Sequence, residues 1–434
     1  MQDFLKNLST SARVQHKINN PALSTAIPKT LKNNSRFIFI AMKNTLKPGW
    51  LIYIPWHPKH KGGVNSVVKN LITEIPRHSE WETFLAYQSW SNEGVANEKK
   101  ELPLKIRRLY SREKTAKELV KFIIFLPHAL FKLHQQITAR NIQCINPHFV
   151  TLHALLFLLY KKWVNHNITL VLSFHGSDVR SIDQFNAIEY RLFNYLLRQA
   201  NQLTTCSNAL KTELLERMPG LSNIHVIYNG INASVADNIE AQQHADASAF
   251  QAPQPYILHV GTFDFAIKGQ DLLINAFKHF AVQKPDYRLV LVGTGEKDKQ
   301  AIQQLITANK LNEKITLLEN IEHKKIMHLM KYADFFVLPS RRESFGLVVL
   351  ESGLVKTPVI AAAVGGIPEI ITHNKTGLLF QADNVDDLLE KMLYFAHLSD
   401  TEKSALATGL YQKIEQTFQW PTIISMFTAL VSTR

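Results

Sequence analysis

The stretch PSRRESFGLVVLE, residues 339–351, is the most informative part of the sequence. It follows the apolar run Phe335–Leu338, which predicts a buried strand, and it leads into a helix. Glu343 stands at the turn between the two. In a parallel sheet flanked by helices, ligands bind outside the carboxyl ends of the strands. The stretch therefore predicts an α/β fold with a ligand site near Glu343.

The start of the helix in this stretch suits a diphosphate. It offers the backbone N–H groups of Ser344, Phe345, Gly346 and Leu347. Unpaired N–H groups and the helix dipole both favour an anion there. Glu351, two turns further on, can accept two hydrogen bonds from a vicinal diol such as a ribose. The alternative is that Glu343 only caps the helix and Glu351 is an unrelated surface residue.

Short apolar runs alternate with amphipathic helical stretches through most of the chain. In the front half, strands are predicted at Trp50–Ile54, Trp81–Ala86, Ile142–Asn146, Ile168–Phe174, Gln202–Cys206 and Ile224–Tyr228. In the back half, they are predicted at Tyr256–Val260, Tyr287–Val292, Ile315–Leu318, Phe335–Leu338, Val359–Ala361 and Leu378–Phe380. Helical patterns include Phe185–Gln199, Asp271–Gln283 and Val385–His397. This alternation predicts βαβ units and parallel sheets.

A change of composition divides the chain. Residues 233–255 are rich in Ala, Gln and Asp and end with two prolines, which predicts a linker. We therefore expect one α/β domain over 49–232 and a second over 256–417, two doubly wound sheets with ligand in the cleft between them. Residues 1–48 form a polar, basic arm that is either disordered or in contact with a membrane.

Glycines follow several other predicted strands, in positions where a ligand can approach the backbone. They are Gly62, Gly63, Gly261, Gly293, Gly295, Gly365 and Gly366. Each motif alone also fits a plain tight turn. Lys268 can reach an anionic leaving group, or it can be a solvated loop residue. His175 and Asp178 follow the strand Ile168–Phe174 and are aimed at a cleft, although a lone histidine can be purely structural.

Composition narrows the class of protein. The 434 residues are 46% hydrophobic and 20% charged, which excludes wholesale disorder and a fibrous repeat. Two cysteines, Cys144 and Cys206, cannot form a disulfide framework or a four-cysteine zinc site, so a reducing, cytosolic setting is expected.

The net charge of +13 is uneven. Residues 1–200 carry 28 basic and 12 acidic side chains, whereas residues 201–434 carry 21 and 24. A partner attracted by charge should therefore meet the front half. Nucleic acid fits the charge but not the motifs, since neither a recognition helix nor a basic strand interleaved with aromatics is predicted.

Two apolar segments are candidates for contact with a membrane. The N-terminus lacks an apolar core after a basic start, so it is a poor secretory signal. Val120–Leu133 is interrupted by Lys121, Pro127 and Lys132, and Leu152–Tyr160 is followed by two lysines and a tryptophan. Neither is long enough to span a bilayer. Both segments are either buried core helices or an interfacial surface.

Taken in order, the motifs resemble those of retaining GT-B glycosyltransferases, in particular glycosyltransferase family 4, also called group 1. They are Gly62-Gly63-Val64, His175-Gly176-Ser177-Asp178, Asn229-Gly230-Ile231, Lys268-Gly269, Gly293-Thr294-Gly295, Glu343 through Glu351 and Gly365-Gly366-Ile367-Pro368-Glu369. The resemblance covers the chain from about Gly49 to its C-terminus. It implies the GT-B fold, two Rossmann-like doubly wound parallel-sheet domains facing a cleft.

The resemblance also implies a role for each matching residue on the donor side. Glu343 would contact hydroxyls of the donor sugar, and the backbone of residues 344–347 would contact its diphosphate. Glu351 would bind the nucleotide ribose. Lys268 would stabilise the departing diphosphate. The remaining donor-binding positions implied are Gly62, Gly63, Gly261, Thr262, Gly293 and Gly295.

On the acceptor side, the resemblance implies that His175 lies near the transferred sugar. Asp178 would lie beside it or hold the loop. One departure concerns Thr262, because an arginine commonly follows the glycine that is Gly261 here. Loss of a guanidinium weakens electrostatic stabilisation of a diphosphate. Arg341 or Arg342 could compensate.

The implied reaction moves a hexosyl unit from a nucleotide-diphosphate sugar to a glycan or lipid-linked acceptor. It would proceed with retention and without a metal or other cofactor, in envelope polysaccharide or lipopolysaccharide synthesis. The basic front half suits an anionic membrane surface, so we expect a cytoplasmic protein, with peripheral attachment to the cytoplasmic face of the inner membrane left open. The alternatives are a nucleotide-sugar epimerase or phosphorylase of the same fold, and a non-catalytic nucleotide-sugar-binding protein.

Enzymes of this family usually send the end of the chain back across the front domain. The sequence Phe418-Gln419-Trp420-Pro421, followed by an apolar run over Thr422–Val431, suits such a crossover helix. Residues 418–434 would then complete the front domain.

Overall fold

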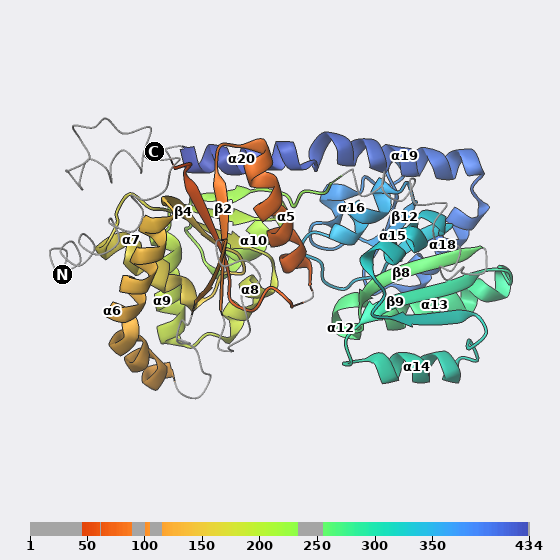
Figure 1. Ribbon diagram of the computed structural model, residues 1–434. Coiled ribbons are helices and arrows are strands. Elements are labelled where there is room, and N and C mark those ends of the chain that lie inside the picture. The colour runs from red at the N-terminus through yellow and green to blue at the C-terminus, as the bar shows by residue number, and fades with distance from the viewer. Residues whose placement is uncertain (1–45, 61, 89–99, 105–114, 233–254, 433–434) are drawn as a thin grey trace, which may run out of the picture. The chain divides into compact units, whose positions relative to one another are not determined.

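The computed structural model describes residues 46–60, 62–88, 100–104, 115–232 and 255–432 (Figure 1). Nearly all of the predicted arm 1–48 and linker 233–255 lies outside these residues. The chain divides into two compact units. Unit 1 comprises residues 1–204, 217–225 and 427–434, and unit 2 comprises 205–216 and 226–426. The first unit thus takes in the chain from 427, whereas the sequence predicted a return at 418.

The first sheet has seven strands in the order β3-β2-β1-β4-β5-β6-β7. Its strands are β1 (Gly49–Ile54), β2 (Glu82–Gln88), β3 (Glu101–Leu104), β4 (Ile142–Pro147), β5 (Thr169–Phe174), β6 (Gln202–Thr205) and β7 (Ile224–Val226). The helices along this part of the chain are α5 (Gly63–His78), α6 (Thr115–Ala139), η2 (Leu152–Ala154), α7 (Leu155–Trp163), α8 (Ser177–Arg180), η3 (Ser181–Gln184), α9 (Ala187–Gln199) and α10 (Asn208–Arg217).

The second sheet has six parallel strands in the order β10-β9-β8-β11-β12-β13. They are β8 (Tyr256–Thr262), β9 (Arg288–Thr294), β10 (Ile315–Glu319), β11 (Phe335–Leu338), β12 (Val359–Ala362) and β13 (Leu378–Phe380). The helices are α12 (Phe265–Lys268), α13 (Gln270–Gln283), α14 (Lys299–Ala308), α15 (His323–Tyr332), α16 (Leu347–Leu354), α17 (Ile367–Ile370), α18 (Val385–His397), α19 (Asp400–Thr417) and α20 (Trp420–Ser432).

Both sheets are doubly wound, so the predicted fold class is confirmed. In each sheet the chain starts at a central strand, runs to one edge and then returns to build the other side. The direction changes between β1 and β4 in the first sheet and between β8 and β11 in the second. Ligands bind at such switch points, outside the carboxyl ends of the strands. The topology therefore predicts a ligand site in each sheet at the carboxyl ends of the two strands that flank the switch point.

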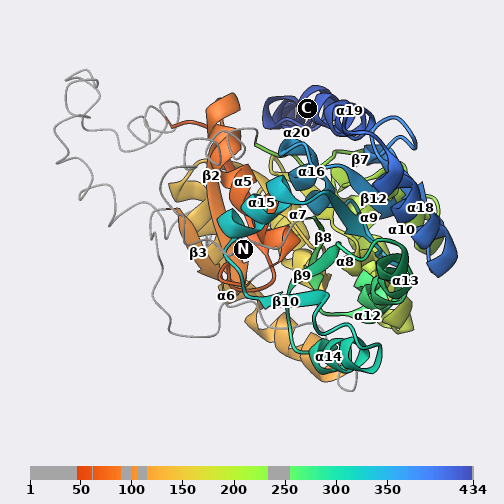
Figure 2. The same ribbon diagram turned by 90° about the vertical axis from the view of Figure 1, so that its right-hand side faces the viewer.

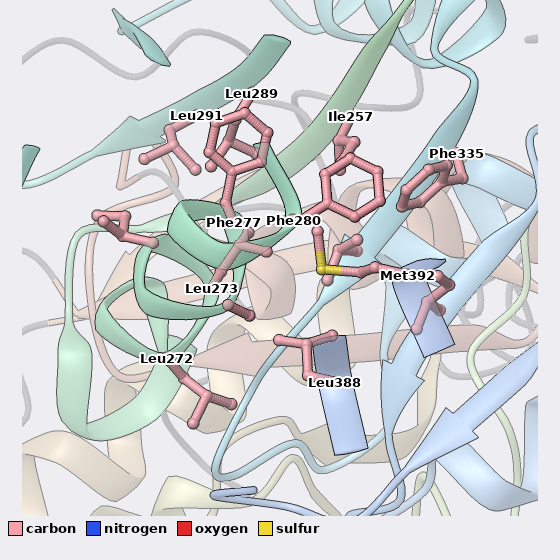
Figure 3. Close-up of a cluster of buried hydrophobic side chains, with 14 of the residues drawn as sticks. Ile257, Leu272, Leu273, Phe277, Phe280, Leu289, Leu291, Phe335, Leu388 and Met392 are labelled. Atoms are coloured by element: carbon pink, nitrogen blue, oxygen red, sulfur yellow. The ribbon is translucent and has the colours of Figure 1, made fainter. Parts of the chain in front are cut away.

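The core of unit 2 lies between the sheet and the helices α13 and α18, which lie side by side (Figure 2). Phe277 and Phe280 of α13 face Leu291 and Phe335 of the sheet (Figure 3). Met392 of α18 closes the same cluster, and all five side chains are fully buried. Burial of a large apolar side chain contributes about 1.5–3 kcal/mol, so this cluster anchors the sheet from which the site is built.

Unit 1 has an aromatic centre that joins the two ends of the described chain. The indole of Trp50 on β1 makes edge-to-face contacts with Trp81 and Phe427, at centroid distances of 5.4 and 6.2 Å. All three side chains are buried. The last turns of α20 thus cover the first strand of unit 1.

Every predicted strand is present, but β3 was missed. It is only four residues long and contains Pro103. Proline removes a ladder hydrogen bond and is tolerated only at a sheet edge, which is where β3 lies. The three helices over 185–199, 271–283 and 385–397 are confirmed to within two residues at each end.

The two apolar segments, Val120–Leu133 and Leu152–Tyr160, differ in how far they are buried. From Leu152 to Tyr160, all side chains except His153 and Leu159 are buried, so this segment is core. In α6, Phe122, Leu126 and Leu130 are buried, whereas Val120, Ile123 and Ile124 are exposed. Among the described residues, no helix has the length and apolar character that crossing a bilayer requires.

Candidate functional site

The switch point of the second sheet brings together two residues that the sequence predicted separately. Lys268 ends the short helix α12, which follows β8, and Glu343 lies in the loop that follows β11. The Nζ atom of Lys268 is 2.6 Å from Oε2 of Glu343. Their side chains are only 20% and 16% exposed. A partly shielded cation and carboxylate therefore meet where a doubly wound sheet binds its ligand.

Two glycines let the segment around Lys268 pack closely against β8 and against the chain that leads to Glu343. The side-chain stem of Lys268 crosses Gly261, whose Cβ, if present, would lie 3.3 Å from Cγ of the lysine. Gly269 has φ +65°, and a Cβ there would overlap the carbonyl oxygen of Pro339. Without side chains at these two positions, the turn after β8 packs directly on the segment that leads from β11 to Glu343.

The Gly365-Gly366 pair serves the loop of Glu343. Gly365 has φ +52°, and a Cβ there would overlap the carbonyl oxygen of Glu343. A Cβ on Gly366 would lie 2.7 Å from the carbonyl oxygen of Ser344. The sequence suggested that these glycines admit a ligand. In the structure they admit the backbone of the loop that carries the carboxylate.

Residues 344–347 form the predicted helix start. The loop is fixed on one side by Ser207, whose hydroxyl donates to the carbonyl oxygen of Ser344 over 2.7 Å. On the other side, the buried ring of Phe345 stacks on Tyr228 at a centroid distance of 5.7 Å. Gly346 has φ +104° and precedes α16, which begins at Leu347. The first N–H groups of a helix lack intrahelical acceptors, so this end of α16 favours an anion.

Glu351 lies in the middle of α16, eight residues after Glu343. Its Oε1 is 2.9 Å from Nε2 of His323, and the carboxylate is 25% exposed. The hydrogen bond to Glu351 raises the pKa of His323 above its usual value. The carboxylate of Glu351, which is predicted to bind the ribose, thus already accepts a hydrogen bond from the exposed side chain of His323.

Arg341 does not substitute for the arginine that the family commonly has at the position of Thr262, because its guanidinium is engaged elsewhere. Its guanidinium donates to both carboxylate oxygens of Asp271, at 2.7 and 2.9 Å, and to Asp383 at 2.5 Å. The bond to Asp271 is the main cause that raises the pKa of Arg341. Thr262 itself is exposed at the end of β8, and its carbonyl oxygen accepts from Gln270. Arg341 therefore ties its loop to α13.

Several buried polar atoms of unit 2 have no hydrogen-bond partner within the described part of the chain. They include Nε2 of His259 and Oγ of Ser340. The Nδ1 atom of His259 donates to the carbonyl oxygen of Val337. Burial and the nearby charge of Lys268 lower the pKa of His259 to about 4. A neutral imidazole with a free acceptor nitrogen beside Lys268 fits a polar ligand.

The predicted glycines Gly293 and Gly295 divide into two kinds. A Cβ on Gly293 would overlap the ring of Phe263, so this glycine lets a loop pack against the strand. Gly295 has φ +97° and open space around it, which leaves its backbone accessible.

Glu369, the last residue of the Gly365–Glu369 motif, accepts from the backbone N–H groups of Asn208 and Ala209 and so caps α10.

In unit 1, a chain of polar side chains lies at the carboxyl ends of the strands, with Asn146 and His148 buried and His175 half-buried. Asn146 is the last residue but one of β4, His148 follows this strand, and His175 follows β5. Nε2 of His148 is 3.0 Å from Oδ1 of Asn146, and Nδ1 of His148 is 2.9 Å from Nε2 of His175. The sequence analysis missed Asn146 and His148, although polar residues at the end of a predicted strand are a signal that could have found them.

This chain of hydrogen bonds fixes the protons on both histidines. The amide nitrogen of Asn146 donates to Val171 and Ser173, so its Oδ1 must accept from His148. His148 therefore carries its proton on Nε2 and accepts on Nδ1 from Nε2–H of His175. Burial lowers the pKa of His148 well below its usual value and that of His175 to about 4. His175 is thus neutral at pH 7, with Nδ1 left as an acceptor.

The tautomer can be measured directly. In ¹H–¹⁵N correlation spectra of histidine-labelled protein, His148 and His175 are both expected to show the Nε2–H form. Neither should gain a proton between pH 5.5 and 8, because the pKa values of both are lowered by burial. His148→Leu removes the acceptor, so the two tautomers of His175 should then mix. A wild-type His175 that carries its proton on Nδ1 would contradict this arrangement.

Asp178 holds loops rather than facing outward. Its buried carboxylate accepts from the backbone N–H groups of Val150, His175, Gly176 and Val179. Of the two roles open to Asp178 in the sequence, the contacts favour holding the loop of His175. Burial outweighs the four N–H groups and raises the pKa of Asp178 to about 6.

The raised pKa of Asp178 predicts how stability depends on pH. Between pH 3.8 and about 6 the folded state holds a proton that the unfolded state has released. The free energy of unfolding should therefore fall as pH rises through this window, by about 3 kcal/mol at most. Urea unfolding of wild type and Asp178→Asn at several pH values isolates this effect. A wild type that gains stability over the variant as pH rises would show that the N–H groups dominate.

Gly62 and Gly63 lie where the sequence placed them, at the start of α5 after β1. Gly62 has φ 158°, close to extended backbone, and has nothing within 4 Å of a would-be Cβ. Asn65, in the first turn, accepts from the indole of Trp56. The start of α5 is therefore an open helix terminus at the switch point of the first sheet.

Two doubly wound parallel sheets in one chain, each with polar residues at its switch point, define the GT-B architecture. Residues 61–235 match the family model of Glycosyltransferase Family 4, and residues 240–408 match that of Glycosyl transferases group 1. The chain belongs to the GT-B glycosyltransferases of this group 1, family 4 type.

Individual relatives agree with this assignment. A glycosyltransferase from Methanocaldococcus jannaschii is 29% identical over 285 residues, 65% of this chain and 73% of the relative. The N-acetyl-alpha-D-glucosaminyl L-malate synthase of Bacillus anthracis is 24% identical over 296 residues, 68% of this chain and 76% of the relative.

Solved structures show the same fold. Sucrose-phosphate synthase from Thermosynechococcus elongatus superposes with a TM-score of 0.70 at 21% identity, over 88% of this chain and 98% of that one. HepE from Anabaena, solved with UDP-glucose, gives 0.64 at 20% identity, over 89% and 100%. These TM-scores establish a shared fold.

Proposed function

We propose that this glycosyltransferase moves a hexosyl unit from a nucleotide-diphosphate sugar to a glycan or lipid-linked acceptor with retention at the anomeric carbon. The observation that carries the proposal is the Lys268–Glu343 pair, 2.6 Å apart at the switch point of the second sheet and beside the start of α16. Glu343 would accept hydrogen bonds from sugar hydroxyls, and Lys268 would neutralise the departing diphosphate.

The chemistry follows from where charge develops. When the bond between the anomeric carbon and the diphosphate oxygen breaks, negative charge grows on the leaving group. The Lys268 ammonium and the N-terminus of α16 stabilise that charge. The acceptor oxygen bonds to the anomeric carbon on the face that the diphosphate leaves, and its proton passes to a phosphate oxygen. This route needs neither a protein nucleophile nor a bound metal.

Glu351 would bind the ribose of the donor in this scheme, and His175 would lie on the acceptor side. The tautomer of His175 leaves Nδ1 as an acceptor, which suits a sugar hydroxyl. We extend the proposal to synthesis of envelope polysaccharide or lipopolysaccharide at the cytoplasmic face of the inner membrane, because residues 1–200 carry the excess positive charge.

A donor screen tests this proposal first. Nucleotide-diphosphate sugars with different bases are added singly, and the melting temperature is measured, because a ligand of the native state raises stability. One base is expected to raise it. Transfer to a lipid extract is then followed with that donor in the presence and absence of EDTA, and turnover should persist.

The other outcomes point elsewhere. Activity lost on chelation would overturn the metal-independent route. Donor binding without transfer would indicate a non-catalytic binding protein, and Thr262 in place of an arginine would then explain the missing activity. Release of free sugar phosphate without an acceptor would indicate a phosphorylase.

A further inference from the structure

An apolar stripe on α6 faces outward from unit 1. Val120, Ile123 and Ile124 are 56%, 58% and 66% exposed, in a helix whose other side is buried. Residues three and four apart lie on one face of a helix, so the three side chains form one continuous stripe. α6 runs along the outer side of unit 1, beside α7 (Figure 1).

The stripe is distinct from the face of α6 that packs on unit 1. On the opposite side of the same helix, Phe122, Leu126, Leu130, Leu133 and Ile137 are at most 7% exposed. These five side chains are enough to pack α6 against unit 1. Val120, Ile123 and Ile124 lie outside this buried face, on the solvent side, where a surface helix normally carries polar residues.

Charge around the stripe indicates what covers it. Lys117 and His128 are exposed and lie within about 40° of Ile124 around the helix, on the basis of 100° per residue, and the exposed Lys132 lies about 80° away. Lys121 borders it as well and pairs with Glu118 over 2.7 Å. An apolar stripe bordered by lysines is the pattern of a helix that lies in a membrane interface.

We propose that this face of α6 docks on an anionic lipid bilayer. It extends the membrane part of the proposed function by naming the element that makes contact. Val120, Ile123 and Ile124 enter the boundary between headgroups and acyl chains, and the lysines meet the lipid phosphates. The alternative segment Leu152–Tyr160 is excluded, because its side chains form core.

Two other occupants fit less well. Protein interfaces are depleted in lysine, whereas lysines border this stripe. A second copy of the chain would bring two front halves together, each with 28 basic and 12 acidic residues over 1–200, and like charges repel.

The test compares matched variants of the full chain in vesicle co-sedimentation. The vesicles are phosphatidylcholine alone or phosphatidylcholine mixed with phosphatidylglycerol. Val120→Glu/Ile124→Glu replaces two stripe residues, and Val282→Glu makes one such replacement on α13, where Val282 is 80% exposed. Wild type and Val282→Glu should bind the anionic vesicles, and raised salt should weaken binding. The double variant should bind at least about tenfold more weakly.

Equal vesicle binding by the double variant and Val282→Glu would overturn the proposal, and so would absence of binding by wild type. A double variant that instead changes the oligomeric state without lipid would assign the stripe to a second copy. Donor-induced shifts of the melting temperature are measured on the same proteins. They separate the two proposals, because unit 2 carries the donor site and the substitutions lie in unit 1.

Discussion

Replacing Lys268 by methionine is expected to lower kcat by about 10²–10³-fold, the usual effect of removing one group that stabilises developing charge. The ammonium is 2.6 Å from Glu343 and only 20% exposed, so solvent cannot readily substitute for it. The loss should appear in kcat more than in donor binding, because the charge on the leaving group grows during the reaction. Initial rates over a range of donor concentrations separate the two effects.

Lys297→Met is the matched control for this variant. Lys297 also pairs with a carboxylate, that of Asp264 at 2.9 Å, but its side chain is 60% exposed. An exposed ion pair contributes about 0–1 kcal/mol to stability, so this substitution should leave both melting temperature and turnover near wild type. If Lys268→Met keeps turnover within about twofold of Lys297→Met, the role given to Lys268 is wrong.

Replacing Gly365 by alanine is expected to have the second large effect, by moving the loop of Glu343. The residue has φ +52°, and its new Cβ would overlap the carbonyl oxygen of Glu343. The left-handed backbone and the overlap together should cost about 2–5 kcal/mol of stability. Displacement of Glu343 by about 1 Å should lower kcat/KM by about 10²-fold. Thermal unfolding and initial rates measure the two effects.

Gly220→Ala separates the backbone cost from the overlap. Gly220 also has positive φ, +75°, but the nearest atom to a new Cβ is the guanidinium of Arg198 at 3.3 Å, the far end of a flexible side chain. It should lose about 1–2 kcal/mol of stability and keep its turnover. A Gly365→Ala protein with the stability and rate of Gly220→Ala would show that the loop of Glu343 is not held by this contact.

The sequence predicted the sheets well because their signal is local. Each strand is a short run of β-branched or apolar residues, and such runs identify buried parallel strands wherever they occur. The exception, β3, is four residues long and contains Pro103, so it carries little of that signal. Placing the ligand edge needed only the rule that loops after parallel strands face the same way.

The contacts within the site could not be predicted, since they join residues far apart in the chain. Gly365 meets Glu343, and Lys268 reaches the same residue from another loop. A guanidinium at Arg341 looked available for a diphosphate, but its partners Asp271 and Asp383 lie some tens of residues away on either side. Periodicity contains no information on such pairs. The predicted roles of the site residues stay predictions until the variants are measured.

The aromatic contact between Trp50 and Phe427 has a consequence for the order of events on the ribosome. Trp50 belongs to the first strand of unit 1, and Phe427 reaches it from α20. All residues of the buried cluster in unit 2 precede Phe427 in the chain. Domains generally fold as they are synthesised, the N-terminal one first. Here unit 1 begins first, but Trp50 has only Trp81 and not Phe427 against its indole until α20 has been synthesised, after the whole core cluster of unit 2.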